Sequence, residues 1–125
     1  MYRKEYALKK KILITDDDAS VQDIFRLILE KAGYDVVVND NGNDLLEDRY
    51  ETPHIFLLDK QLSGVDGIDV CRHLKTCDTT RDIPVLMISA YPGLAPLAKT
   101  AGADDYLEKP FLIKELLSKV ERLLK

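Results

Sequence analysis

The sequence lacks any apolar segment long enough to cross a membrane as a helix. Its longest uncharged stretch begins at Ile83, ends before Lys99 and contains three of the five prolines, whereas a membrane span needs about 20 mostly apolar residues. A signal peptide is lacking too, because no apolar run follows the basic N-terminal residues. We therefore expect a cytoplasmic protein with no membrane partner.

Cysteine and histidine are also scarce, with two residues of each. Cys71 and Cys77 are too few for a disulfide framework, which predicts reduced thiols. Cys71 falls in an apolar helical stripe and is expected in the core. No cysteine or carboxylate stands at a recognised metal-ligand spacing from His54 or His73, so structural roles are predicted for both histidines.

Basic residues are not in excess over most of the sequence. The net charge of the whole chain is −4. Residues 1–11 contain five basic and one acidic side chain, so they carry +4 and residues 12–125 carry −8. An acidic body argues against direct nucleic-acid binding, which uses a basic face. We expect one domain over residues 11–125. A basic N-terminal extension over residues 1–10 would precede it, either solvated or in contact with an acidic partner.

Five short apolar runs alternate with amphipathic segments along the chain. The runs occupy residues 12–14, 36–38, 55–58, 85–88 and, more weakly, 106–107. Such runs are typical of parallel strands that are buried on both faces. The alternation predicts an α/β fold, a (βα)5 doubly wound parallel five-stranded sheet. The fourth helix is expected to be short, from about residue 96 to residue 101, because Pro92 and Pro96 stand where it would begin.

Polar and charged side chains stand at the ends of the predicted strands. They are Asp16 and Asp17 after the first run, Asp59 after the third, Ser89 at the end of the fourth and Lys109 after the fifth. Ligands of open α/β sheets bind beyond the carboxyl ends of the strands, so these five side chains are expected at one edge. The alternative is that the aspartates only cap helices and that the lysine lies on the surface. Asp18 is interpreted as such a loop or capping residue.

Carboxylates grouped at one edge need a counter-charge. Two carboxylates about 4 Å apart repel by ~4 kcal/mol at an effective dielectric constant of about 20. Mg²⁺ prefers oxygen ligands and retained waters, and a metal beside a carboxylate can neutralise a phosphoryl group as it is transferred. The edge is therefore predicted to bind Mg²⁺ and a phosphoryl group, with Lys109 and Ser89 as donors to phosphate oxygens.

Five segments, in sequence order, resemble the receiver domain of two-component response regulators. They are ILITDDD at 12–18, LLD at 57–59, GVDG at 64–67, PVLMISA at 84–90 and AGADDYLEKPF at 101–111. The resemblance covers residues 11–125 and implies a flavodoxin-like fold with strand order 2-1-3-4-5. It also implies a place in a phosphorelay. A sensor histidine kinase or phosphotransfer protein would be the donor, and an unknown protein would be the downstream target.

The resemblance assigns a phosphoacceptor and a set of metal ligands. Asp59 would take the phosphoryl group from a phosphohistidine. Asp16, Asp17 and Asp59 and the backbone carbonyl of Gln61 would hold Mg²⁺. The expected activities are self-phosphorylation from a phosphodonor and slow autodephosphorylation, so a conventional enzyme is not expected.

The resemblance also assigns a switch. Ser89 and Lys109 would contact the phosphoryl oxygens, and the ring of Tyr106 would move inward when Ser89 is drawn toward the phosphate. The Lys109–Pro110 bond would be cis. A homodimer that depends on phosphorylation is one form that the output could take.

Several positions near the site depart from the family's pattern or set its variable properties. Ser63 stands where the family usually has proline, which leaves the loop after the phosphoacceptor less constrained. Gln61 and Tyr91 flank the path of the hydrolytic water and would tune the phosphoryl lifetime. Ser89 and Lys109 are 20 residues apart, which is short for the family and agrees with a short fourth helix.

Two other functions compete with the phosphoacceptor interpretation. A phosphate-independent receiver-like protein-binding module is favoured by the disturbed fourth crossover and opposed by the retained acidic residues. An aspartyl-phosphate hydrolase resembles Asp-x-Asp at a strand end, whereas Asp59-Lys60-Gln61 lacks the second aspartate.

Overall fold

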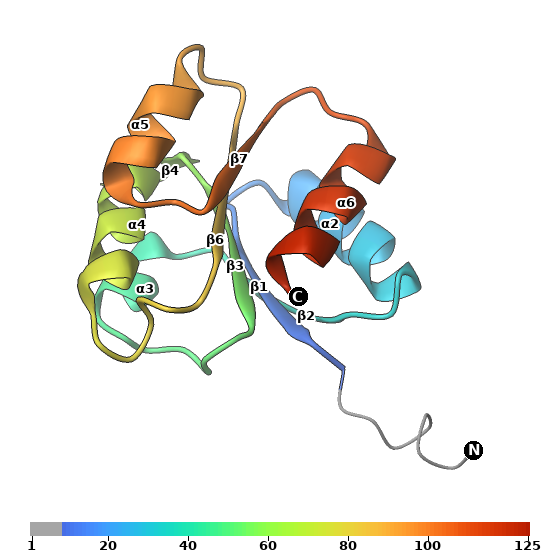
Figure 1. Cartoon of the computed structure of the whole chain (residues 1–125), viewed down its shortest axis with the longest axis horizontal. Helices are drawn as coiled ribbons and strands as arrows, with labels where there is room; N and C mark the ends of the chain where they lie inside the picture. The colour runs from blue at the N-terminus through green and yellow to red at the C-terminus, as the bar shows by residue number, and fades with distance from the viewer. Residues whose placement is uncertain (1–8) are drawn as a thin grey trace.

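The central sheet contains five parallel strands in the order β2-β1-β3-β6-β7. They are β2 (Asp35–Asn39), β1 (Lys11–Thr15), β3 (Ile55–Asp59), β6 (Val85–Ser89) and β7 (Asp105–Glu108). The computed structural model describes residues 9–125, and Figure 1 shows helices on both sides of the sheet. Counted in chain order, these five strands give 2-1-3-4-5, so the predicted doubly wound, flavodoxin-like fold is confirmed.

The strands alternate their side chains between two separate apolar cores. In β1, Ile12 and Ile14 enter one core, whereas Leu13 enters the other. Phe56 in β3 and Met87 in β6 lie on the same side as Leu13. This period of two follows from strand geometry, and it explains why each strand reads as a continuous apolar run.

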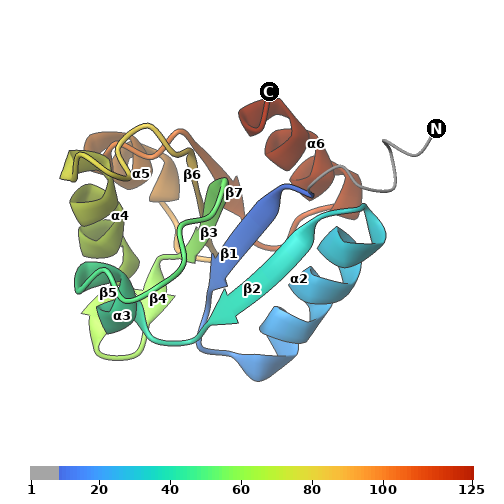
Figure 2. The same cartoon turned by 90° about the horizontal axis from the view of Figure 1, so that it is seen from below.

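Two helices cover one face of the sheet and three cover the other (Figures 1 and 2). The first pair is α2 (Ala19–Lys31) and α6 (Ile113–Leu123). The opposite face is covered by α3 (Gly42–Leu46), α4 (Gly67–Thr76) and α5 (Leu94–Ala101). In the described part of the chain, no helix is long and apolar enough to span a membrane.

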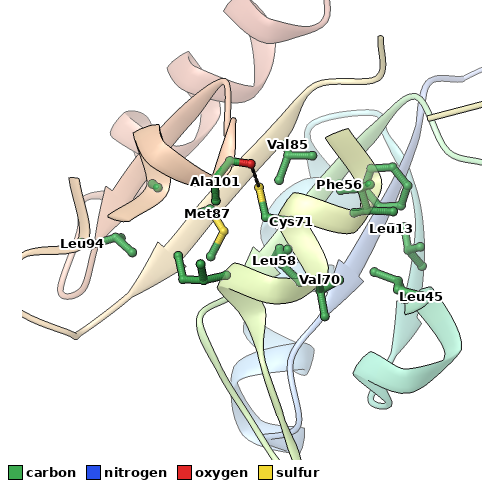
Figure 3. Close-up of a cluster of buried hydrophobic side chains, with 13 residues drawn as sticks. Leu13, Leu45, Phe56, Leu58, Val70, Cys71, Val85, Met87, Leu94 and Ala101 are labelled. Carbon is green, nitrogen blue, oxygen red and sulfur yellow. Dashed lines mark hydrogen bonds between the residues drawn. The ribbon is translucent and has the colours of Figure 1, made fainter. Parts of the chain in front are cut away.

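Cys71 lies in the core between the sheet and α4, as the apolar stripe predicts (Figure 3). Its side chain is fully buried, and Sγ lies 3.7 Å from the backbone oxygen of Ala101 in α5. Burial raises the pKa of the Cys71 thiol to about 11. Cys71 is therefore a packing residue that stays protonated near neutral pH.

The fourth crossover helix, α5, begins two residues earlier than the sequence analysis predicts. Pro96 is the third residue of the helix, where a backbone N–H has no acceptor within the helix, so the proline ring removes no hydrogen bond. Gly93 precedes the helix with a φ of 81°, a conformation that glycine adopts without steric cost.

A two-stranded hairpin that the sequence analysis does not predict follows β3. Its antiparallel strands, β4 (Gln61–Leu62) and β5 (Val65–Asp66), are too short to show an apolar alternation. The hairpin leads into Gly67, whose N–H donates to the carbonyl oxygen of Lys60 at 2.7 Å. A Cβ atom on Gly67 would lie only 2.1 Å from the backbone oxygen of Asp59. This close approach fixes the start of α4 against the end of β3.

Two aspartates near the carboxyl edge cap helices. The side chain of Asp18 accepts hydrogen bonds from the N–H groups of Ser20 and Val21 at the start of α2. Asp66 accepts from the N–H of Ile68 at the start of α4. The capping role predicted for Asp18 is confirmed.

The predicted basic extension falls almost wholly on residues 1–8, which lie outside the described residues. Lys9 and Lys10 are described, and both are exposed immediately before β1. The proposed boundary between extension and domain therefore stays a prediction.

Candidate functional site

The sheet register aligns the predicted site residues at one edge. The last residue of β1, Thr15, pairs with the residue before Asp59, so Asp16 and Asp59 leave the sheet side by side. Lys109 follows β7, and its N–H donates to the carbonyl oxygen of Ser89 at 2.9 Å. Short loops after neighbouring parallel strands thus collect residues that are far apart in the sequence.

The ammonium group of Lys109 lies between the buried carboxylate of Asp16 and the largely buried carboxylate of Asp59. Its Nζ is 3.4 Å from Oδ2 of Asp59 and 3.6 Å from Oδ2 of Asp16. Asp16 is only 3% exposed. Burial raises the pKa of Asp16 to about 6, the backbone N–H of Asp18 lowers it, Asp59 raises it further and Lys109 opposes the rise. One lysine therefore balances only part of the negative charge at this edge.

Asp59 is oriented by the turn that follows it. The N–H of Gln61 donates to Oδ1 of Asp59 at 2.9 Å, which leaves Oδ2 facing Lys109. The Asp59 side chain is 11% exposed. One carboxylate oxygen is thus held by the backbone and the other faces the cation.

The carboxylate of Asp17 points to a different partner. Its Oδ2 accepts hydrogen bonds from the backbone N–H of Ser63, at 2.8 Å, and from the Ser63 hydroxyl. In the described part of the chain, one trio of metal-binding side chains has its ligand atoms within 4.8 Å of one another, and that trio does not include the site aspartates. Because Lys109 joins Asp16 and Asp59, Asp17 is the one of the three that lies apart, drawn toward the hairpin by Ser63.

Ser89 and Tyr91 form the far side of the site. Ser89 is fully buried, and its hydroxyl oxygen accepts from the N–H of Tyr91 at 2.9 Å. The Nζ of Lys60 lies 4.5 Å from the centroid of the Tyr91 ring and 3.2 Å from Oδ2 of Asp66. A cation–π contact of this kind contributes about 0.5–1 kcal/mol at an exposed site. It holds Tyr91 beside the loop that follows Asp59.

Tyr106 faces outward in this structure. The residue is 37% exposed, and the Nζ of Lys119 lies 5.6 Å from its ring centroid. The inward movement predicted for Tyr106 would start from this position. The cis bond predicted between Lys109 and Pro110 is present.

A purely structural role is predicted for His73, but the structure places two other metal-binding side chains beside it. Its Nε2 lies 3.1 Å from Oδ1 of Asp48 and 3.5 Å from Sγ of Cys77. The spacing of four residues between His73 and Cys77 is a signal that the sequence does contain, because residues i and i+4 share a helix face. His54 fits its predicted structural role, since its Nδ1 accepts from the N–H of Lys11 at 2.8 Å.

The oxygen donors at the carboxyl edge fit Mg²⁺ by their chemistry. Mg²⁺ is usually bound through one or two carboxylates and keeps several waters. Asp16 and Asp59 already share one cation and lack full charge compensation. Asp17, on the loop after β1, and the carbonyl of Gln61, the first residue of β4, are further oxygen donors nearby.

Comparisons with known proteins agree on one protein family. The family model of the response regulator receiver domain matches residues 12–121. The DNA-binding dual master transcriptional regulator RpaA of Synechocystis sp. is 40% identical over 119 residues, which cover 92% of this chain and 49% of RpaA. The chain thus spans about half the length of this curated relative.

Solved structures share the fold over nearly the whole chain. A protein described as a response regulator from Chloroflexus aurantiacus has a TM-score of 0.87 and 32% identity, covering 94% of this chain and 98% of that one. The receiver domain of a sensor histidine kinase from Pseudomonas aeruginosa has a TM-score of 0.83 and 25% identity, with coverage of 94% and 98%. That structure holds a magnesium ion in its active-site cleft.

Proposed function

Because the chain belongs to the response regulator receiver domain family of two-component systems, we propose that it accepts a phosphoryl group on Asp59 and signals by a change in its surface. The position of Lys109 carries this proposal. Its ammonium group lies between Asp59 and Asp16 at the carboxyl edge of the sheet, where a phosphoryl group would add further negative charge.

The proposed transfer begins with an attack by a carboxylate oxygen of Asp59 on the phosphorus of a phosphohistidine. A P–O bond forms while the P–N bond of the donor breaks. The imidazole nitrogen leaves with the bonding electrons and takes a proton from the solvent. Lys109 remains charged and pairs with a phosphoryl oxygen, as an ammonium group can without strict geometry. In the slow autodephosphorylation that would follow, water attacks the phosphorus, the P–O bond to Asp59 breaks, and inorganic phosphate and the free carboxylate are released.

Mg²⁺ is the proposed cofactor, held by Asp16, Asp17, Asp59 and the backbone carbonyl of Gln61. When bound, the ion neutralises the carboxylates and the phosphoryl oxygens during transfer. Asp17 would first exchange its two hydrogen bonds from Ser63 for the metal. The magnesium ion of the Pseudomonas aeruginosa receiver domain supports this assignment.

Ser89 and Tyr106 are the proposed switch. The Ser89 hydroxyl would turn from the N–H of Tyr91 toward a phosphoryl oxygen. The exposed ring of Tyr106 would then move inward, and the population of surface conformations would shift. Gln61 and Tyr91 flank this region and would set the lifetime of the phosphorylated state.

The proposed partners are a histidine kinase or phosphotransfer protein in the cytoplasm and a downstream effector. That the partners include no nucleic acid stays a prediction, because RpaA is a DNA-binding protein and this chain spans only about half of it. The acidic charge of residues 12–125 argues against a nucleic-acid contact made by these residues.

Intact mass after incubation with acetyl phosphate and Mg²⁺ tests the proposed function. We expect one phosphoryl group on the native chain and none on Asp59→Asn or without metal. Asp69→Asn, an exposed aspartate on α4 paired with Arg72, is the matched control and should be phosphorylated normally. Absence of an adduct on the native chain would contradict the proposal and favour a phosphate-independent binding module.

A further inference from the structure

Three metal-binding side chains meet at the end of α4 that lies away from the phosphoacceptor. Oδ1 of Asp48 lies 3.1 Å from Nε2 of His73, and Sγ of Cys77 lies 3.5 Å from the same nitrogen. The three ligand atoms lie within 4.8 Å of one another, and within residues 9–125 no other trio of His, Cys, Asp or Glu does so. Carboxylate, imidazole and thiol are three different ligand types, so this group differs in kind from a surface acidic cluster.

The separation between the nitrogen and sulfur ligand atoms of this trio matches that in a tetrahedral zinc complex. Zinc–nitrogen bonds of about 2.0–2.1 Å and a zinc–sulfur bond of about 2.3 Å imply an N···S separation of about 3.6 Å. The observed separation of Nε2 and Sγ is 3.5 Å. Sγ also lies 3.8 Å from Nδ1, so the sulfur stands beside the imidazole ring, and the Cys77 side chain would rotate toward the lone pair of Nε2 when an ion binds.

The backbone fixes where the three ligands stand. His73 and Cys77 are one turn apart, and the N–H of Cys77 donates to the carbonyl oxygen of His73 at 3.1 Å where α4 ends. Asp48 follows α3 with a φ of 59°, an uncommon conformation for a residue other than glycine. Because α3 and α4 pack side by side (Figures 1 and 2), this turn presents the Asp48 carboxylate to His73.

The surroundings of the trio favour a neutral metal complex. The His73 side chain is 27% exposed, and Cys77 is half-buried. Tyr50 follows Asp48 by two residues, and its side chain is half-buried. The Tyr50 ring packs edge-on against the buried ring of Phe56 and lies against the core from outside. A divalent ion here would be balanced by one carboxylate and one thiolate.

We propose that Asp48, His73 and Cys77 form a Zn²⁺ site, with water as the fourth ligand. Sulfur and imidazole ligands favour zinc over the hard cation Mg²⁺. On binding, the thiol proton of Cys77 passes to the solvent and the thiolate bonds to the metal, while the neutral imidazole of His73 binds through Nε2. The ion would tie the loop after α3 to the C-terminal end of α4.

This site is separate from the proposed phosphoacceptor. Helix α4 starts beside Asp59 and has ten residues, which at ~1.5 Å per residue carry the chain about 15 Å away. The two sites share no residue. The zinc proposal and the phosphorylation proposal can therefore fail independently.

Cobalt absorption spectroscopy on the full chain tests the zinc proposal. Co²⁺ is added in excess Mg²⁺, so that the oxygen ligands around Asp59 are occupied. We expect a thiolate-to-cobalt charge-transfer band in the near ultraviolet that one equivalent of Zn²⁺ abolishes. Only a thiolate ligand produces this band, so cobalt bound by carboxylates alone would not.

Variants assign the ligands. Cys77→Ser should remove the band, and His73→Gln should lower zinc affinity in calorimetry by at least about 100-fold, since even outer-sphere changes cost about 10–100-fold. Asp48→Asn should lower it by at least about tenfold. The matched controls are Cys71→Ala and His54→Gln, which alter the other cysteine and the other histidine and should keep the band.

A second measurement guards against unfolded variants. Zn²⁺ should raise the Tm of the native chain and of Asp59→Asn equally, because binding to the folded state alone is stabilising. It should not raise the Tm of Cys77→Ser, whose phosphorylation at Asp59 should be unchanged. Absence of the band in the native chain, or zinc affinity unchanged in both Cys77→Ser and His73→Gln, would overturn the proposal.

Discussion

At the scale of single residues, the carboxylate of Asp17 is the least expected feature of the proposed magnesium site. Its Oδ2 accepts two hydrogen bonds from Ser63, a residue of the turn between β4 and β5. Asp16 and Asp59 instead share the ammonium group of Lys109. Under the proposed function, magnesium binding would therefore compete with the serine for Asp17, and this competition would depend on the residue at position 63.

Ser63→Ala should strengthen Mg²⁺ binding. The change removes the hydroxyl donor to Asp17 and keeps the backbone donor. A net hydrogen bond is worth about 0.5–1.5 kcal/mol, so the Kd should fall by a factor of about 2–12 in calorimetric titration. Ser118→Ala, an exposed serine on α6, is the matched control. An unchanged or weaker affinity in Ser63→Ala would show that the serine does not oppose the metal.

The residues that the sequence predicts best are those directly at strand ends. Asp16, Asp59, Ser89 and Lys109 meet because parallel strands end at one edge, which the apolar runs already mark. The contact of Ser63 with Asp17 joins loops 46 residues apart, and no periodicity encodes the direction of such a loop. The position of Asp48 next to His73 depends in the same way on a turn with positive φ.

At the scale of secondary-structure elements, ion pairs join the edge strand β7 to helix α6. Asp105 accepts hydrogen bonds from Lys119 at 3.2 Å and from Arg122 at 2.6 Å. Burial raises the pKa of Asp105, but the donors Tyr106 N–H, Lys119 and Arg122 outweigh it, and the pKa is lower than its usual 3.8. The charged form of this carboxyl is therefore favoured in the folded state.

Asp105→Asn should lower the free energy of unfolding near neutral pH by about 1–2 kcal/mol, because hydrogen bonds to charged groups are lost. Because the pKa of Asp105 is lower in the folded state than the unfolded value of 3.8, this carboxylate stabilises the folded protein at pH values above 3.8. This stabilisation is lost as the pH falls through the folded-state pKa. Urea unfolding at decreasing pH should thus show the difference from the native chain shrinking. Asp69→Asn, at an exposed pair, should change stability little. A difference independent of pH would contradict this account.

The contact between β3 and α4 leaves no room for a side chain at Gly67. A Cβ atom there would meet the backbone oxygen of Asp59 at 2.1 Å, so Gly67→Ala should lower the free energy of unfolding by about 2–3 kcal/mol through overpacking. A Cβ atom on Gly33 would meet nothing within 4 Å, but the residue has a φ of 101°. Gly33→Ala should therefore lower the free energy of unfolding by only about 1 kcal/mol. Equal urea midpoints for the two variants would contradict the tight contact.

The main strands and the helices α2, α4 and α6 follow from apolar periodicity, whereas α5 is expected only from the alternation of strands and helices, and the short α3 and the hairpin show no such pattern. The hairpin of β4 and β5 has two residues per strand, fewer than a repeating pattern needs. The predicted start of α5 is two residues too late, because the prediction places Pro96 first in the helix, whereas the third position also tolerates proline.

At the scale of the whole molecule, the two apolar cores occupy the faces of the sheet, so the polar site residues lie at the carboxyl ends of its strands. One core lies under α2 and α6, the other under α3, α4 and α5. The carboxyl edge carries Asp59 and its neighbours, and the far end of α4 carries the proposed zinc ligands. Family membership is established by the match over residues 12–121, while the identity of the phosphoacceptor is the central proposal.

Chemical mapping of the phosphorylated residue tests that proposal most directly. The chain is phosphorylated with acetyl phosphate and Mg²⁺, the acyl phosphate is reduced with borohydride, and peptide mass spectrometry locates the aspartate converted to homoserine. We expect conversion at position 59 alone. Conversion at Asp16, at Asp17 or at any other aspartate, or at none, would contradict it.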